Sequence, residues 1–559
     1  AFHFAWTFFA EEQVVGSSIG MKRIIQAFNR LALGLALLGF ATAALPSFLG
    51  AQELPWLRKG QVRLDFAPTF LTWDSRYGVD STGAEQVELL GSDLTGTPMG
   101  SRILPDLVDL EANLAAAMGD PAYRTSLGFS RAYIDQSRLV IPFRLELGVT
   151  DWLSVGGMVP IVRSRTEMTF TLDGDSLTAT DGTSPFATDP SPVIDFLDAI
   201  RGALLEAEAA HPGDPAVLET ATYLNALSQA YGYGTFFPAD GSAPGRKLQE
   251  RLDELRAAFQ ALGIPGMPQT VPLAADYLDE EGFQEFLGGR QMRAQRLEDF
   301  SGLWSIGDVE VTANVRILRR GFEPDSLGDL PRLRFQVGGG VLVRLGTGEQ
   351  ADPARFFSQD IGDGQMDMEG NVFGLLELGR RFGAWGQVRY GIQKEGEVFR
   401  RITHPDNALP NYSRTAPLTW TPGDYLDFEV NPRVFLTPEM SFGVRYHFWN
   451  KGADSYALGA IDPEIQDPAE LPPADLLDLQ TEQTLQEIGL SAAYSTVEAN
   501  ARGEASMPLY VRASYFHPIS GSGGQTPKGG RFQIGLTLFK SIWGGRRASE
   551  NSPEDPVGR

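Results

Sequence analysis

Five histidines are the side chains of this 559-residue chain that titrate near neutral pH, and only His447 falls on the inward side of a predicted strand. Hydrolysis by an activated serine needs a serine within hydrogen-bond reach of such a base. No Gly-x-Ser-x-Gly turn, which would present that serine, occurs in the predicted mature chain. We therefore interpret His447 as a polar packing residue and predict that the protein is not an enzyme.

Acidic residues gather at Asp360, Asp363 and Asp367 around two glycines, which suggests calcium ligands. Their spacing does not match the D-x-[DN]-x-[DN]-G loop, so an acidic external loop is favoured. The chain has no cysteine, which excludes disulfides and thiolate metal sites. We expect neither a bound metal nor another cofactor.

Charged residues that alternate with apolar ones are the strongest signal in the chain. From Val309 to Ile317 every second residue is apolar, whereas Asp308, Glu310 and Arg316 lie on the other face of the strand. The strand that ends at Leu345 repeats this pattern, and similar alternation predicts strands at Gln61–Trp73, Ser137–Val149, Trp152–Arg163 and Tyr425–Phe435. A long apolar face opposite a densely charged face is typical of a wall between lipid and a polar lumen, as in a transmembrane β-barrel.

The charged residues that this parity turns inward are the candidate transport-path residues. They are Arg144, Glu146, Asp308, Glu310, Arg316, Arg332, Arg334, Arg344, Glu377, Arg389, Asp427, Glu429, Arg433, Arg445, His447 and Arg512. Rings of charge can set pore selectivity, but the same charges can pair across neighbouring strands and fill a narrow barrel. Pairing is favoured for any single residue. The excess of arginine leads to the hypothesis of a weak preference for anions.

Composition agrees with a barrel and excludes two other classes. The mean hydropathy of −0.15 is too polar for a helical membrane protein, whereas a barrel needs only alternate strand residues to be apolar. The formal charge of −24 argues against a nucleic-acid partner, because phosphate binding needs a basic face.

An export signal begins at Met21. Lys22, Arg23 and Arg30 precede the apolar run Leu31–Phe40, which is too short to span a membrane as a helix. We predict an upstream extension over 1–20 that is not part of the mature protein and a signal peptide over 21–51. Barrel strands 1–3 with their loops follow over 61–184, a helical insertion over 185–301, barrel strands 4–12 over 302–543 and a disordered tail over 544–559.

The lengths of the connections predict the orientation of the barrel. Turns such as Arg380–Gly383 and Leu436–Glu439 are short, and the intervening Lys394–Asp424 and Asn450–Gln483 are long. Outer-membrane barrels have short periplasmic turns and long external loops. The insertion is therefore external.

The insertion itself is predicted to be helical. Cap-then-proline starts at Ser191-Pro192 and Asp214-Pro215, together with apolar spacing, predict helices at Val193–Ala210, Pro215–Tyr231, Arg246–Leu262 and Leu278–Phe300. A lid or plug over the pore and a surface cap are both open interpretations.

Several phrases resemble a known family. They are Val140–Val162, Ile306–Glu310, Leu345–Gly348, Asp360–Gly374 leading to Arg380–Gly383, and Leu436–Gly443. These strand-and-turn phrases resemble an outer-membrane barrel family named for the meta-pathway of phenol degradation. The resemblance covers most of the predicted barrel but not the helical insertion. It implies an outer-membrane barrel that passes aromatic compounds, and it supplies no catalytic residue.

The sequence thus predicts an all-β protein: a transmembrane antiparallel β-barrel of about 12 strands with a large helical insertion in an external loop. We expect it in the bacterial outer membrane, in contact with lipid and lipopolysaccharide, as a channel for small solutes that include aromatic or hydrophobic compounds. The alternative is a non-conducting surface-display protein, and a barrel hydrolase is less favoured. The sequence does not define the oligomeric state.

Overall fold

The computed structural model describes residues 56–79, 82–96, 98–174, 178–322, 332–464 and 466–542. The predicted upstream extension, the signal peptide and the tail from residue 544 lie outside the described residues.

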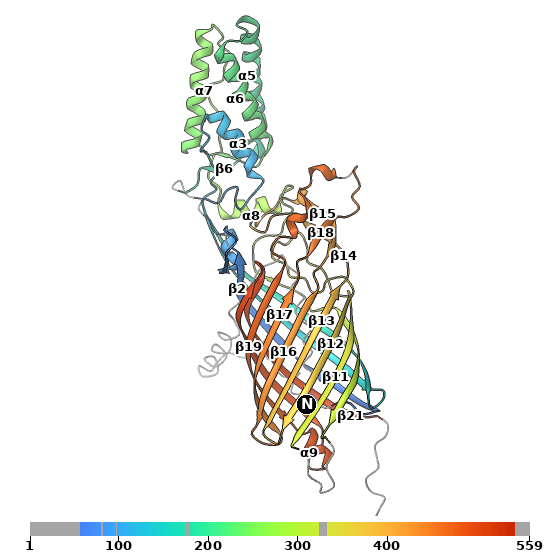
Figure 1. Cartoon of the computed structure of the whole chain (residues 1–559). Coiled ribbons are helices and arrows are strands. Elements are labelled where there is room, and N and C mark those ends of the chain that lie inside the picture. The colour runs from blue at the N-terminus through green and yellow to red at the C-terminus, as the bar shows by residue number, and fades with distance from the viewer. Residues whose placement is uncertain are drawn as a thin grey trace, which may run out of the picture.

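Long antiparallel strands form one closed β-barrel (Figure 1). The last strand, β21, pairs with β20 on one side and with β1 and β2 on the other, which closes a barrel of 12 strands. The predicted fold class is confirmed. The barrel is built from β1 (Gln61–Phe66) and β2 (Thr69–Val79), which together make the first strand, and from β4 (Phe129–Gly148), β5 (Leu153–Asp173), β10 (Val309–Arg320), β11 (Leu333–Leu345), β12 (Asp367–Leu378), β13 (Phe382–Gln393), β16 (Tyr425–Phe435), β17 (Met440–Lys451), β19 (Gln483–Ser495), β20 (Leu509–Ser522) and β21 (Thr526–Ser541).

Side chains alternate between the two faces of the barrel wall. On β10 and β11 the outward residues Val311 and Val341 are 52% and 59% exposed, whereas the inward Glu310 is 2% exposed. Successive side chains of a strand point to opposite faces, so an apolar outer band and a polar lumen follow directly from the sequence pattern. Separately, the described helices include none that is both long and apolar enough to cross a membrane.

The two ends of the barrel differ. Short turns at 149–152, 379–381 and 436–439 lie at one end, together with the connection that holds α9 (Val497–Ala501) (Figure 1). The long connections lie at the other end. The rule of short periplasmic turns makes the long-loop end the extracellular one.

The first hairpin after the broken strand extends beyond the barrel. β4 and β5 are 20 and 21 residues long and pair over their full length, from Gly148 and Ser154 to Phe129 and Asp173. We predicted shorter arms, because the apolar alternation fades where the strands leave the membrane band. β3 (Glu85–Leu89), β8 (Phe300–Ser301) and β9 (Ser305–Ile306) add short pairings at this end.

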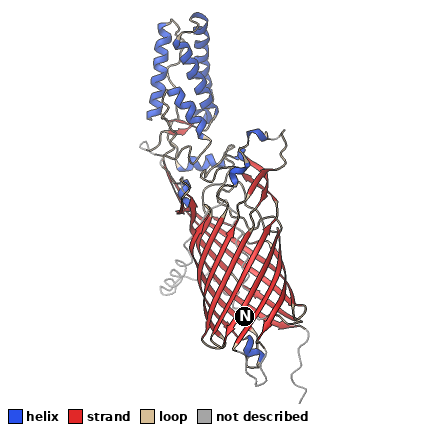
Figure 2. Cartoon of the chain, viewed as in Figure 1, coloured by secondary structure: helices blue, strands red, loops and turns tan. Residues whose placement is uncertain are grey.

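A helical bundle stands beyond the extracellular end, displaced from the barrel (Figure 2). The insertion contributes α4 (Pro185–Thr188), α5 (Ser191–Ala210), α6 (Pro215–Gly232) and α7 (Ala243–Ala261), with a two-stranded pair of β6 (Asp181–Thr183) and β7 (Phe236–Pro238). A separate loop contributes α3 (Leu107–Met118), which packs on α6 and α7. The caps differ in detail: Asp214 accepts from the Ala216 N–H as predicted, whereas Ser191 already belongs to α5.

The last predicted helix, Leu278–Phe300, is wrong over most of its length. Only α8 (Glu280–Gly288) is helical, and it lies near the barrel mouth (Figure 1). Gly288 and Gly289 end it, and Gly289 is extended. Glycine disfavours helix continuation because it has more backbone freedom to lose. A three-stranded sheet of β14 (Gly396–Arg401), β15 (Thr415–Thr421) and β18 (Ser455–Leu458) also covers the mouth.

A short N-terminal segment crosses the opposite end of the lumen. Trp56 precedes β1, yet its ring stacks on Phe373 of β12 at a centroid distance of 6.2 Å. Trp56 and Phe373 are both buried. Because β1 and β12 are not neighbours in the closed sheet, this segment narrows the lumen near its periplasmic end.

Candidate functional site

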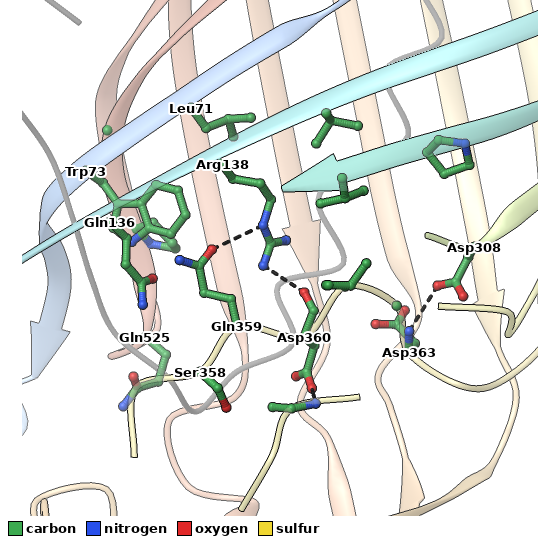
Figure 3. A pocket seen from close by; sticks show the side chains of 18 of the residues that line it. Leu71, Trp73, Gln136, Arg138, Asp308, Ser358, Gln359, Asp360, Asp363 and Gln525 are labelled. Carbon is green, nitrogen blue, oxygen red and sulfur yellow. Dashed lines mark hydrogen bonds between the residues drawn. The ribbon is translucent and has the colours of Figure 1, made fainter. Parts of the chain in front are cut away.

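A cavity of about 230 Å³ lies inside the barrel, between the lumen-facing strands and a loop that folds inward (Figure 3). That loop, residues 346–366, joins β11 to β12. It places Phe356, Gln359 and Asp360 against the cavity, opposite residues of β2, β4 and β5. The cavity therefore has a wall made by the barrel and a roof made by a loop.

One strip of the barrel wall of the cavity is apolar. Inward residues of β4 and β5 supply it, and they occupy facing positions in the strand register. These residues are Val140, Pro142, Met158, Pro160 and Val162. The long hairpin therefore presents an apolar strip to an otherwise charged lumen.

Pro142 and Pro160 are direct cross-strand partners within this strip. The carbonyl of Pro160 accepts from the Gly307 N–H at 2.9 Å, on the side away from β4. Neither proline has an N–H to donate. On the other side of Pro142, the first strand breaks at Ala67 and Pro68, between β1 and β2. Backbone pairing of the barrel wall is thus interrupted on both sides of the hairpin at the level of the cavity.

The inward loop is fixed by the carboxylate of Asp308. Its Oδ1 accepts from the Gly348 N–H at 2.8 Å, and its Oδ2 accepts from the Asp363 N–H at 3.0 Å. Asp308 is buried and immediately precedes β10. Burial, together with the carboxylates of Asp367 and Asp308, raises the pKa of Asp363 to about 7. Asp308 therefore holds the roof of the cavity at two backbone positions, and the roof contains a carboxyl group with a pKa of about 7.

The polar part of the cavity centres on Arg138 of β4 (Figure 3). Its Nε donates to Oε1 of Gln359 at 3.2 Å, and its Nη2 donates to the carbonyl of Asp360 at 2.8 Å. Gln136, two residues earlier, donates to the carbonyl of Phe357 at 3.0 Å. These contacts join the hairpin to the roof loop.

Ion pairs follow one another around the lumen, and four of their residues also line the cavity: Glu310, Arg344, Glu487 and Arg531. Arg344 contacts Glu310 at 3.3 Å and Asp367 at 2.9 Å, and Arg389 joins Glu369 to Asp427. The pairs in order are Arg63–Glu146, Arg144–Glu310, Arg344–Glu310, Arg344–Asp367, Arg389–Glu369, Arg389–Asp427, His447–Asp427, His447–Glu487 and Arg531–Glu487. We call this set the ion-pair belt. It runs from β1 to β21, the two strands that close the barrel.

The structure brings most of the sequence-predicted lumen residues together. All are buried except Arg316 and Glu429, which are half-buried, and Arg332, which is exposed. Arg332 lies before β11 at the periplasmic rim and not inside the lumen. Arg334, Arg433 and Glu377 form a second group of ion pairs, and Arg445 pairs with Glu429. Arg512 on β20 is buried as well.

His447 is held by two carboxylates. Nδ1 lies 2.7 Å from Oε2 of Glu487, and Nε2 lies 2.9 Å from Oδ2 of Asp427. Both ring nitrogens therefore donate, which is the arrangement of a charged imidazolium. A catalytic base needs one nitrogen free to accept a serine proton. This geometry opposes the version of a barrel hydrolase that uses His447.

The acidic loop does not assemble a calcium site within the described residues. Asp360 pairs with Arg400 at 3.1 Å, and Asp367 pairs with Arg344 at 2.9 Å. In the described part of the chain, no group of three or more acidic or histidine side chains is placed to hold a metal. The carboxylates instead fasten the loop to the barrel.

A closed barrel with an apolar outer band satisfies every strand within the wall, which is the requirement for crossing a bilayer with β-strands. The protein is a bacterial outer-membrane β-barrel protein. No protein-family model and no curated protein matches the chain.

Similar solved structures are outer-membrane barrels. An outer-membrane channel from Pseudomonas putida F1 is 9% identical over 87% of this chain and 97% of that chain, with a TM-score of 0.38. The CymD monoaromatic hydrocarbon channel is 9% identical over 92% and 96%, with a TM-score of 0.25. The translocator domain of the autotransporter NalP from Neisseria meningitidis is 7% identical over 88% and 91%, with a TM-score of 0.27. At these values the activities of those proteins do not transfer to this chain.

Sequence reasoning missed the roof loop and Arg138. Arg138 shares the inward parity of Arg144 on the same strand, so parity could have found it. The inward fold of 346–366 depends on the contact of Asp308 with Gly348 and Asp363, which lie 40 and 55 residues further along the chain. Nothing in the local pattern of the loop indicates that contact.

Proposed function

We propose that the protein is a channel that admits small hydrophobic solutes, aromatic compounds among them, through the outer membrane. The observation that supports this proposal is the half-apolar cavity between the ion-pair belt and the roof loop. An apolar cavity of ~150 Å³ is large enough to hold benzene. A cavity of about 230 Å³ therefore offers room for a single substituted ring or a short alkyl chain.

The belt disfavours free passage of water-soluble solutes along the barrel axis. Its carboxylates and guanidinium groups pair with each other, so they fill space and leave few charges for a hydrated ion. Trp56 on Phe373 narrows the lumen further toward the periplasm. The candidate transport-path residues outside the cavity lining, such as Arg389 and Asp427, would then act as a polar floor that an apolar solute avoids.

The interrupted wall beside Pro142 and Pro160 offers a route out of the cavity. Separating two strands costs the hydrogen bonds between them. At this level the wall lacks the two proline N–H donors, and the cavity reaches both proline rings. We infer that an apolar solute moves sideways from the cavity into the membrane through the wall near the β4–β5 hairpin.

The test is uptake of radiolabelled toluene by cells that produce the protein, compared with cells that carry an empty vector. Met158 lines the cavity and is 6% exposed, whereas its neighbour Val159 faces outward and is 39% exposed. Met158→Trp fills the cavity and is expected to abolish the added uptake. Val159→Trp adds the same bulk on the lipid side and is expected to leave uptake unchanged. Equal uptake by both variants and the native protein would contradict the proposal.

Surface display is the second candidate, and the helical bundle is the observation that favours it. α5, α6 and α7 stand beyond the mouth and to one side of the barrel (Figure 1). This position supports the interpretation as a surface cap rather than as a plug.

The resemblance to the phenol-degradation family and the preference for anions are kept as hypotheses. Single-channel currents in a planar bilayer test both conduction and ion preference: no current together with no toluene uptake would favour display.

A further inference from the structure

Arg138 lines the cavity and, unlike Arg344, Arg400 and Arg531 of the same lining, forms no ion pair among the described residues. Arg400 and Arg531 contact the carboxylates of Asp360 and Glu487. Arg401 donates from three nitrogens to backbone carbonyls. Among the described residues Arg138 has two hydrogen bonds, both to neutral oxygens, and no ion pair. Its charge is therefore inside the barrel without a carboxylate in contact.

A second donor beside Arg138 also lacks a partner. Oε1 of Gln359 accepts from Arg138, but Nε2 of Gln359 is buried and makes no hydrogen bond within the described residues. A buried donor without an acceptor costs about 1–3 kcal/mol. Arg138 and Gln359 both line the cavity and lie side by side in Figure 3. A ligand oxygen that accepts from both would satisfy them together.

The apolar strip continues directly from Arg138. Val140 and Pro142 lie two and four residues after Arg138 on β4, on the same inward face. At about 3.4 Å per residue, they extend the site by roughly 7 and 14 Å from the Arg138 position. The site thus joins a cationic end to an apolar surface long enough for one ring or a short chain.

The nearby acids do not occupy this position. The carboxylate of Asp360 is engaged by Arg400 at 3.1 Å and by the Ala351 N–H at 2.5 Å. Asp363 lies on the side of the cavity near Asp308, whose carboxylate accepts its backbone N–H (Figure 3). Neither residue forms an ion pair with Arg138.

We propose that the cavity binds a monovalent organic acid with a compact apolar body, with the carboxylate on Arg138 and Gln359 and the body along Val140 and Pro142. This inference rests on the proposed function and narrows its solute class. Hydrogen bonds to charged groups contribute about 1.5–3 kcal/mol, so the acid should bind at least roughly 10-fold more tightly than a neutral molecule of the same shape.

The test uses isothermal titration of the purified full chain in detergent with benzoate and with benzamide, its neutral analogue. The native protein is expected to prefer benzoate by at least roughly 10-fold. Arg138→Met should lower benzoate affinity to that of benzamide. The matched control is Arg163→Met, because Arg163 is exposed and its register partner, Leu139, adjoins Arg138. That variant should keep the preference.

Heat-modifiable migration on gels verifies that each variant has a folded barrel. Gln359→Leu removes the second donor and should reduce the benzoate preference. If Arg138→Met does not fold, the affinities of Gln359→Leu are measured in its place. The inference would be overturned if the native protein bound benzoate and benzamide equally, or if the folded variant kept the native preference. If Met158→Trp still abolished toluene uptake, only this inference would fail. If the native protein and both Trp variants took up toluene equally, the proposed function would fail as well.

Discussion

Pro142 and Pro160 face each other across the β4–β5 hairpin, at the point where the backbone pairing of the barrel wall is interrupted on either side. Valine at both positions restores the missing N–H donors while keeping apolar side chains of similar size. We predict that the double variant Pro142→Val, Pro160→Val takes up toluene several-fold more slowly than the native protein. Single-channel conductance is the control and should not change, because valine keeps apolar side chains of similar size on the lumen face. A faster uptake would argue against a lateral route.

Asp308 is expected to hold the roof loop in place. Asp308→Ala removes the acceptor of two charge-assisted hydrogen bonds, each of which contributes about 1.5–3 kcal/mol. The loop should then leave the lumen for part of the time, and single-channel conductance should rise. Asp352→Ala is the matched control, since Asp352 is an exposed residue of the same loop. Conductance that is the same for both variants would show that the loop has other sufficient anchors.

Packing of the roof loop should depend on pH through Asp363. Its pKa is raised from 3.8 to about 7, first by burial and then by Asp367 and Asp308, while Arg344 opposes the shift. A group with a raised pKa in the folded state contributes stability that is present at low pH and lost as pH rises. The protection factors of the amides in 346–366, which correct hydrogen exchange for its intrinsic rate at each pH, should therefore be higher at pH 5 than at pH 8. Asp363→Asn should remove most of this difference, and lower protection at pH 5 would contradict the assignment.

His447 is predicted to be a structural residue. His447→Ala leaves Asp427 and Glu487 with one cation each in place of two. Loss of one partner from a buried ion pair costs about 3–5 kcal/mol. The temperature at which the folded barrel loses its compact gel migration should fall. His447→Lys, which keeps a positive charge, should recover part of the loss, and an unchanged transition would mean that the belt compensates.

The helical bundle should depend on α3, although a different loop supplies that helix. Deleting 185–289 removes α5 to α7 and exposes Leu110 and Leu114, both of which are fully buried in the bundle. We predict that this deletion aggregates, whereas the same deletion with Leu110→Ser and Leu114→Ser stays soluble in detergent. Toluene uptake by the second form should match the native protein if the bundle is a surface cap. Faster uptake would indicate a lid.

Much of the barrel can be predicted from the sequence, because the alternation of apolar and polar residues along a strand is a local property. β16 has the bounds that its alternation predicts, Tyr425–Phe435. The first strand was expected to be continuous over Gln61–Trp73, yet it breaks at Ala67 and Pro68, since a proline cannot donate in the middle of a sheet. The inward parity of Arg144 and Glu310 was also readable from the pattern.

The cavity was not predictable in the same way. Its roof depends on Asp308, whose hydrogen bonds reach 40 and 55 residues along the chain, and on Arg138, whose partners belong to that roof. Strand alternation predicts the face on which a side chain lies, but it does not predict which distant loop contacts that side chain. For that reason the lumen charges were expected before the structure and the solute site was not.

The ion-pair belt has a consequence for how the barrel assembles. A slip of one residue in any strand turns its inward side chains outward. Such a slip would place residues such as Arg389 or Asp427 against lipid, at a cost of up to about 2–4 kcal/mol for each basic residue near the midplane. Every member of the belt has its partner on another strand. The belt is therefore neutralised only when all of these strands are in the correct register, and a strand that slips leaves unpaired charges both on itself and on its partners.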